Sequence, residues 1–127
     1  MENILIIGLG GFFGAVLRYG LSGYVQYLSR DISFPYGTLA VNLLGCFIIG
    51  FISQLVESHG VLHPKTRSFL LIGLLGSFTT FSTFGNESLN LLLDGKNFLS
   101  LVNISLHIIA GLGFVWLGRI AASALGS

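Results

Sequence analysis

The chain has few charged residues. Only 9% of its 127 residues are Asp, Glu, Lys or Arg, whereas about a quarter are charged in a typical soluble domain. So few charges could not cover the surface of a folded domain in water, and the mean hydropathy of +0.86 is correspondingly high. This composition excludes a soluble globular protein and indicates a membrane protein with several crossings.

The net charge is close to zero, and the chain has only one cysteine. Six basic and five acidic residues leave a formal net charge of +1, so no basic patch argues for nucleic acid or acidic lipid as a partner. The single cysteine, Cys46, has no second cysteine to pair with and lies in an apolar run, where we expect a small buried side chain.

His59 and His63 have the spacing of a metal-binding pair, but Pro64 follows directly and a third ligand is missing, so we expect a solvated loop. Without a nucleophile and base pair or a metal set, we do not expect an enzyme.

Long apolar runs make up most of the sequence. A helix needs about 20 residues to cross a bilayer, so the chain has room for a single all-α domain of four transmembrane helices joined by short polar turns. The first run is longer than the apolar segment of a signal peptide, which has roughly 7–15 residues, and we expect it to be retained as a helix. The expected helices span residues 4–28, 36–56, 68–93 and 98–125.

The third run contains an unusual cluster of hydroxyls. Residues 76–84 read Gly-Ser-Phe-Thr-Thr-Phe-Ser-Thr-Phe. β-Branched threonines weaken a helix, and each hydroxyl can bond a nearby backbone group in place of the helical ladder. We therefore expect the third helix to be broken near its centre. Non-helical backbone at that depth is tolerated only where protein or a water-filled cavity satisfies it, which is typical of transport sites.

Polar side chains also interrupt the first two expected helices. Arg18 lies inside the first, where a charge costs several kcal/mol unless it reaches the lipid headgroups or faces an aqueous vestibule that attracts anions. Thr38 and Asn42 are four residues apart and share one face of the second. Asn42 could join two helices through a hydrogen bond or present a donor to a pore, and both interpretations stay open. Gly10 and Gly14 share a face of the first helix and predict that another helix packs closely there.

The last two expected helices carry further polar residues. Glu87 lies near the far membrane surface, where we expect it to be hydrated; the alternative is an acid that holds the break in shape or handles a proton. A lone histidine in an apolar helix, His107, is expected to be a hydrogen-bonded packing residue. His107 and Asn103 nevertheless remain candidates for the polar side of a pore.

The loops carry too little charge to set an orientation. Four helices put both termini on one side of the membrane, and the basic loop residues divide three against two between the sides. The positive-inside rule needs an excess on one side, so the chain is expected to insert in both orientations. Two such chains can pair as an antiparallel two-fold dimer whose broken helices meet at the centre of the bilayer. The three residues are Lys65, Arg67 and Arg119, and the two are Arg30 and Lys96.

Three segments resemble the signature blocks of the CrcB/Fluc family of fluoride channels. They are residues 10–19 (Gly-Gly-Phe-Phe-Gly-Ala-Val-Leu-Arg-Tyr), residues 37–43 (Gly-Thr-Leu-Ala-Val-Asn-Leu) and residues 76–84. The blocks fall in three of the four expected helices, in order. The resemblance implies an antiparallel, dual-topology homodimer in the cell (plasma or inner) membrane. Its two pores, each built from both subunits, would export cytoplasmic fluoride by passive electrodiffusion.

The resemblance also implies roles for individual residues. Phe81 and Phe84 would line the path of fluoride, with Asn42 as the pore asparagine and Arg18 in the vestibule. The backbone carbonyls of Gly76 and Thr79 from both subunits would hold a structural sodium ion, and no organic cofactor is implied. Hydroxyls along a polar track would come from Ser82, Thr83 and Thr38, and the fourth helix would contribute His107 or Asn103.

The chemistry of fluoride is compatible with these side chains. Fluoride is small and strongly hydrated, so a pore must replace its water with hydroxyl or amide donors and with the positive edges of phenylalanine rings. The main alternative is a small dual-topology multidrug or cation exporter. Such an exporter needs a membrane-embedded carboxylate in its first helix, where this chain has Arg18. A purely structural four-helix protein is disfavoured because packing alone does not require the hydroxyl cluster.

Overall fold

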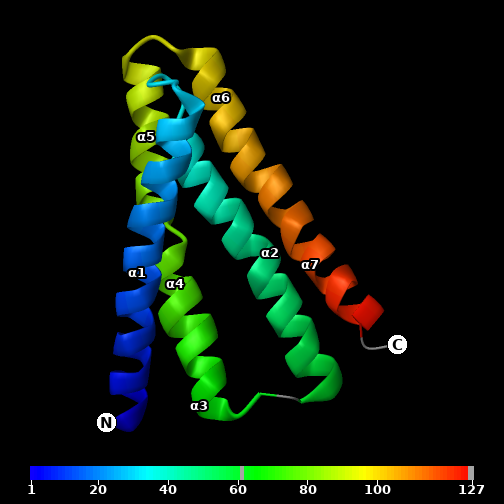
Figure 1. Ribbon diagram of the computed structural model, residues 1–127. Coiled ribbons are helices and arrows are strands. Elements are labelled where there is room, and N and C mark those ends of the chain that lie inside the picture. The colour runs from blue at the N-terminus through cyan, green and yellow to red at the C-terminus, as the bar shows by residue number, and fades with distance from the viewer. Residues whose placement is uncertain (61, 126–127) are drawn as a thin grey trace.

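The computed structural model describes residues 1–60 and 62–125, and every element in these ranges is helical (Figure 1). Two segments, η1 and η2, have the wider π-helical turn, which is often found at functional sites. The elements are α1 (Glu2–Ser29), α2 (Tyr36–His59), α3 (Pro64–Arg67), η1 (Ser68–Leu74), α4 (Leu75–Phe78), α5 (Phe81–Leu93), α6 (Asn97–Ser105), η2 (Leu106–Ala110) and α7 (Gly111–Leu125).

These elements make up four spans that are long and apolar enough to cross a membrane. The spans are Glu2–Ser29, Tyr36–His59, Pro64–Leu93 and Asn97–Leu125. Successive spans run in opposite directions, so the start of α1 and the end of α7 lie toward one end of the molecule and the α1–α2 and α5–α6 turns lie at the other (Figure 1). The prediction of an all-helical chain with four membrane-length helices is confirmed.

The second loop is shorter than the residues 57–67 expected for it. α2 continues to His59 and ends where Gly60 adopts a left-handed conformation with φ of 58°. Helical structure resumes at Pro64, so only a few residues separate the two spans, of which Val61 lies outside the described residues. The polar Glu57 suggested a loop, but it lies in the last turn of α2 and forms an ion pair of 2.9 Å with Arg119 on the adjacent α7.

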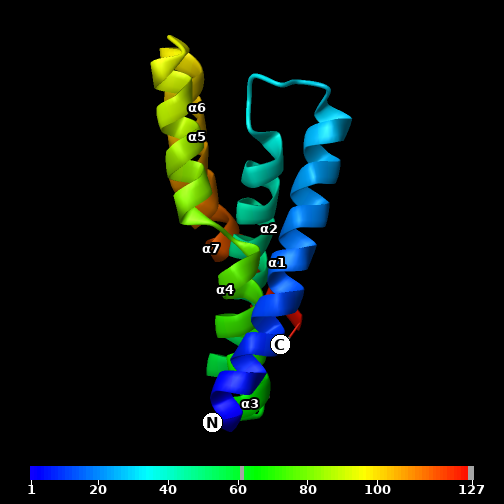
Figure 2. The ribbon, with the colours of Figure 1, turned by 90° about the vertical axis from the view of Figure 1, so that its left-hand side faces the viewer.

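α1 packs closely against η1 and α4, as the glycines at one face of α1 predict (Figure 2). A Cβ atom on Gly10 would lie 2.5 Å from the carbonyl oxygen of Phe69, and one on Gly14 would overlap the carbonyl oxygen of Leu74. Only glycine allows the backbones to approach this far. The prediction for Gly10 and Gly14 is therefore confirmed.

α2 lies between the other helices. It packs along α7, and Gly50 and Gly118 allow this contact because a Cβ atom on either would overlap a carbonyl oxygen of the facing helix. On its other side α2 meets α4 at a small core of Val41, Leu75 and Phe78. Most large apolar side chains outside this core point outward, as expected where lipid or another subunit covers them.

The third span does not keep a helical backbone throughout. Thr79 (φ −90°, ψ 158°) and Thr80 (φ −148°, ψ 118°) are extended, and they separate α4 from α5. These two residues come from the hydroxyl-rich block of residues 76–84. They lie where α2 and the fourth span approach the third, and the candidate site forms around them.

Candidate functional site

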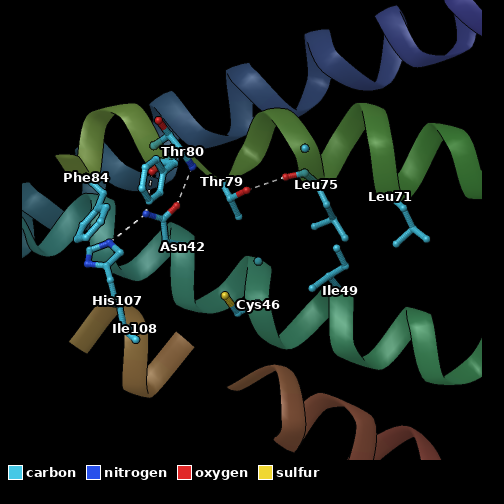
Figure 3. A pocket seen from close by; sticks show the side chains of 13 residues that line it. Asn42, Cys46, Ile49, Leu71, Leu75, Thr79, Thr80, Phe84, His107 and Ile108 are labelled. Carbon is cyan, nitrogen blue, oxygen red and sulfur yellow. Dashed lines mark hydrogen bonds between the residues drawn. The ribbon is translucent and has the colours of Figure 1, made fainter. Parts of the chain in front are cut away.

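Asn42 bonds both backbone groups of Thr80 (Figure 3). In a continuous helix the amide of Thr80 would donate to the carbonyl of Gly76. Here that amide donates to Oδ1 of Asn42 at 2.8 Å, and Nδ2 of Asn42 donates to the Thr80 carbonyl at 3.1 Å. Asn42 is 9% exposed, so these bonds replace solvent in satisfying the extended backbone. Asn42 therefore joins two spans, one of the two interpretations that the sequence left open.

The hydroxyl of Thr80 starts the next helix. Its Oγ1 accepts from the amide of Thr83 at 3.3 Å, which is the usual bond of a helix N-cap. In a continuous helix the Thr83 amide would donate to the carbonyl of Thr79. These two bonds therefore take the helical donors of two carbonyls at the break, those of Gly76 and Thr79. These are the two carbonyls that the family resemblance implies for sodium.

Arg18 bonds the backbone at the end of α4. Its Nε donates to the carbonyl of Ser77 at 3.0 Å, across 59 residues of sequence. This carbonyl would otherwise be one of the unsatisfied acceptors that every helix C-terminus leaves. The sequence suggested a headgroup anchor or a vestibule charge for Arg18. The bond to Ser77 is a third role, in which a half-buried guanidinium supports the break.

A cavity of about 380 Å³ lies beside the two extended residues (Figure 3). Six of the predicted site residues line it, and it is bounded by α2, the third span and the π-helical η2. Its surface is mainly apolar, with a few polar groups from the break. The predicted residues in the lining are Asn42, Gly76, Thr79, Phe81, Phe84 and His107, joined by Gly45, Cys46, Ile49, Leu71, Leu75, Thr80 and Ile108.

Three rings follow one another at this cavity. The ring centroids of Phe81 and Phe84 are 5.5 Å apart, and those of Phe84 and His107 are 4.2 Å apart. Phe84 is 9% exposed, whereas Phe81 is 80% exposed within the single chain. One ring is thus packed inside the subunit and the next projects from its surface.

His107 connects the fourth span to the break. Its Nε2 lies 3.0 Å from Nδ2 of Asn42, and its Nδ1 lies 3.0 Å from the carbonyl oxygen of Asn103. Asn103 is fully buried, and its Nδ2 donates at 3.0 Å to the hydroxyl of Ser88 on α5. Ser88 in turn donates to the carbonyl of Phe84 at 2.8 Å. A chain of hydrogen bonds therefore connects α5, the fourth span and α2.

Glu87 is not simply hydrated, and that expectation is wrong. Its side chain is half-buried, and Oε2 accepts from the hydroxyl of Thr38 at 3.1 Å. Oε1 is buried and has no hydrogen-bond partner among the described residues. Sequence spacing could not anticipate this contact, because Thr38 and Glu87 lie 49 residues apart and on different spans.

Some predicted site residues lie away from the cavity. Arg18, Thr38, Ser82 and Thr83 are outside its lining, and Ser82 is exposed on the surface of α5. Conversely, the structure gives Thr80 a central position that the sequence analysis did not single out. The spacing of Thr80 and Thr83, which matches an N-cap and the third residue of a helix, was the signal that could have identified it.

The site offers oxygen ligands from the backbone and few from side chains. No group of three or more His, Cys, Asp or Glu residues is positioned for a metal within residues 1–60 and 62–125. Gly76 and Thr79, whose carbonyls have lost their helical donors, both line the cavity.

The four spans make this chain a multi-pass membrane protein with polar groups clustered at an interrupted helix. Residues 5–119 match the family model described as "CrcB-like protein, Camphor Resistance (CrcB)". The chain belongs to this CrcB-like family.

Relatives match along nearly the whole chain. "Fluoride-specific ion channel FluC 1" of Methanosarcina acetivorans is 46% identical over 127 residues, which cover 100% of this chain and 95% of the relative. "Fluoride-specific ion channel FluC" of Methanococcus maripaludis is 47% identical over 96% of this chain and 97% of the relative. A protein of the same name from Citrifermentans bemidjiense is 44% identical over 98% of this chain and all of the relative. The resemblance proposed from three short blocks is therefore confirmed at the level of the family.

Proposed function

We propose that this protein is a fluoride-specific ion channel that lets fluoride leave the cell by passive electrodiffusion. The observation that carries the proposal is the interruption of the third span at Thr79 and Thr80, beside a cavity lined by Phe81 and Phe84. The names of full-length relatives support fluoride as the ion. Four apolar spans support a site in the cell membrane.

The donors around the break suit a small anion. Ring edges of Phe81 and Phe84 carry partial positive charge. The hydroxyl of Thr83 accepts from Thr80 at 3.1 Å, which leaves its own proton to donate. Because these groups are neutral, they can replace water around fluoride without trapping it, as conduction requires. Arg18, on the neighbouring α1, bonds the carbonyl of Ser77 and so adds a positive potential beside the break.

A second copy of the chain completes the site in this proposal. Phe81 is 80% exposed and Gly76 is also exposed, so both project from the single chain at the edge of the cavity. An antiparallel partner would cover this face and add its own rings, which gives two equivalent pores by symmetry. The balanced basic residues of the loops allow the opposite insertion that such a dimer needs.

A sodium ion is the third part of the proposal. The carbonyls of Gly76 and Thr79 would hold it. The amides that would bond these carbonyls in a continuous helix donate instead to Asn42 and to the hydroxyl of Thr80. Two carbonyls from each of two subunits would surround the ion at the dimer axis. The ion supplies positive charge that holds the two interrupted helices together. Its role is structural, and no step of ion flow involves it.

Liposomes test the proposed function directly. Purified protein in vesicles loaded with potassium fluoride should release fluoride to an external electrode when a potassium ionophore carries the countercharge. Vesicles loaded with potassium chloride are the matched control for selectivity. Release no faster than from protein-free vesicles would refute the channel. Release that needs a proton gradient rather than the ionophore would instead favour a coupled exporter.

A further inference from the structure

His107 makes two contacts that together determine where its proton lies. Nδ1 is 3.0 Å from the carbonyl oxygen of Asn103, and a carbonyl can only accept. Nδ1 must therefore carry a proton. This bond runs back along the same span from η2 to α6, so it fixes the ring relative to its own helix.

The second contact constrains the other nitrogen independently. Oδ1 of Asn42 accepts from the amide of Thr80 at 2.8 Å, which identifies the oxygen side of this amide. The NH2 group of Asn42 therefore faces His107, with Nδ2 at 3.0 Å from Nε2. Because NH2 can only donate, Nε2 must be an unprotonated acceptor. Both contacts require the same form, a neutral imidazole with its single proton on Nδ1.

This form leaves no imidazole N–H for an anion. Nδ1–H is bonded to Asn103, and Nε2 has a lone pair rather than a proton. The Asn42 amide is similarly occupied, since its NH2 group donates to the Thr80 carbonyl and to His107. His107 was expected to be a hydrogen-bonded packing residue, with a place on the polar side of a pore as the alternative, and in this form it offers no N–H to a pore.

We infer that His107 is a positioning residue: its Nε2 accepts from Asn42 and thereby fixes the orientation of the amide that holds Thr80 in its extended conformation. If the Asn42 amide turned over, its NH2 group would face the Thr80 N–H, and two donors would oppose each other. The ring of Phe84, tilted by 35° with 4.2 Å between ring centroids, packs against the imidazole. Two other titratable groups belong to the surroundings of this arrangement: Cys46 lines the same cavity, and Glu87 is bonded to Thr38 on α2.

Nitrogen NMR tests the inference without any measurement of ion flow. A chain with His59→Gln and His63→Asn has His107 as its only imidazole, and Asn keeps an N-cap before Pro64. With ¹⁵N-labelled histidine at neutral pH, we expect a protonated Nδ1 and an unprotonated Nε2. An Nε2–H tautomer or an imidazolium would overturn the inference. This result does not depend on whether the protein conducts fluoride.

Matched variants test the consequence for ion flow, which rests on the proposed function. His107→Phe keeps a ring against Phe84 but removes the acceptor, and it should slow fluoride efflux at least about tenfold, the effect of about 1.4 kcal/mol. His107→Gln keeps an acceptor in its side-chain oxygen and should recover most of the rate. In an Asn42→Leu background, His107→Phe should cause no further loss. Equal losses in Phe and Gln variants that elute as wild type on a sizing column would contradict the positioning role.

Discussion

Asn42 satisfies both backbone groups of Thr80, accepting its N–H at 2.8 Å and donating to its carbonyl at 3.1 Å. One side chain thus replaces the bond that the Thr80 N–H loses at the interruption and adds a bond to the Thr80 carbonyl. The arrangement holds a residue of the third span against α2 through two hydrogen bonds. Asn42 therefore links the fold of the chain to the geometry of its cavity.

Replacing Asn42 by Leu should disable the site. The substitution leaves the N–H of Thr80 without its partner, which costs about 1–3 kcal/mol, and also removes the bond from Asn42 to the Thr80 carbonyl. We expect a lower thermal midpoint in detergent and a fluoride efflux rate at least about tenfold below wild type. Asn42→Asp is the informative companion, because a carboxylate can still accept from the Thr80 amide but cannot donate to its carbonyl. An Asp variant as fast as wild type would contradict the need for the second bond.

The close contact of α1 with η1 and α4 at Gly14 offers a matched pair of substitutions. A Cβ atom on Gly14 would overlap the carbonyl of Leu74 and the hydroxyl of Ser77, whereas one on Gly8 would meet nothing within 4 Å. Gly14→Ala should therefore destabilise the chain by about 1–3 kcal/mol, the usual cost of overpacking. Gly8→Ala should leave stability close to wild type. Thermal unfolding in detergent distinguishes them, and equal midpoints would mean that the helices are not this close.

The two phenylalanines at the cavity should respond differently to the same change. Phe84 is buried against His107, so Phe84→Ile should lower both stability and fluoride efflux. Phe81 is 80% exposed in the single chain, so Phe81→Ile should slow efflux while the subunit keeps its stability. Efflux from liposomes and unfolding in detergent measure the two effects separately. If Phe81→Ile conducts at the wild-type rate, the ring is not part of the ion path.

Much of the fold could be predicted from the sequence because a bilayer imposes length and hydrophobicity on each span. The four apolar runs and the close contact at Gly10 and Gly14 follow from local composition and helical periodicity alone. The membership of the CrcB-like family also followed from three short blocks.

The polar contacts between spans could not be predicted in the same way. Periodicity places Thr38 and Asn42 on one face of α2, but it does not identify Glu87, Thr80 or His107 as their partners. These bonds join residues 38 to 65 positions apart, and they depend on how the helices tilt and cross. Glu87 was expected to be hydrated for the same reason, since its distance along the helix suggested a surface position and its partner was unknown.

Sodium should stabilise the dimer if the carbonyls of Gly76 and Thr79 hold it. A ligand that binds only the assembled state favours that state by mass action. We expect the dimer fraction in lipid to fall when sodium is replaced by N-methylglucamine, and to recover when sodium returns at the same ionic strength. Single-molecule counting of labelled subunits in liposomes measures this fraction. A dimer fraction that is independent of sodium would argue against the cation site.

The reversal potential across a planar bilayer tests the central claim most directly. With a tenfold gradient of fluoride and equal chloride and pH on both sides, a passive fluoride channel should reverse near 59 mV in magnitude, with the sign set by the fluoride gradient. The Phe81→Ile variant in the same bilayer should carry less current at the same reversal potential. A reversal potential that stays near zero in the fluoride gradient, or one that follows an imposed chloride or proton gradient, would contradict the account.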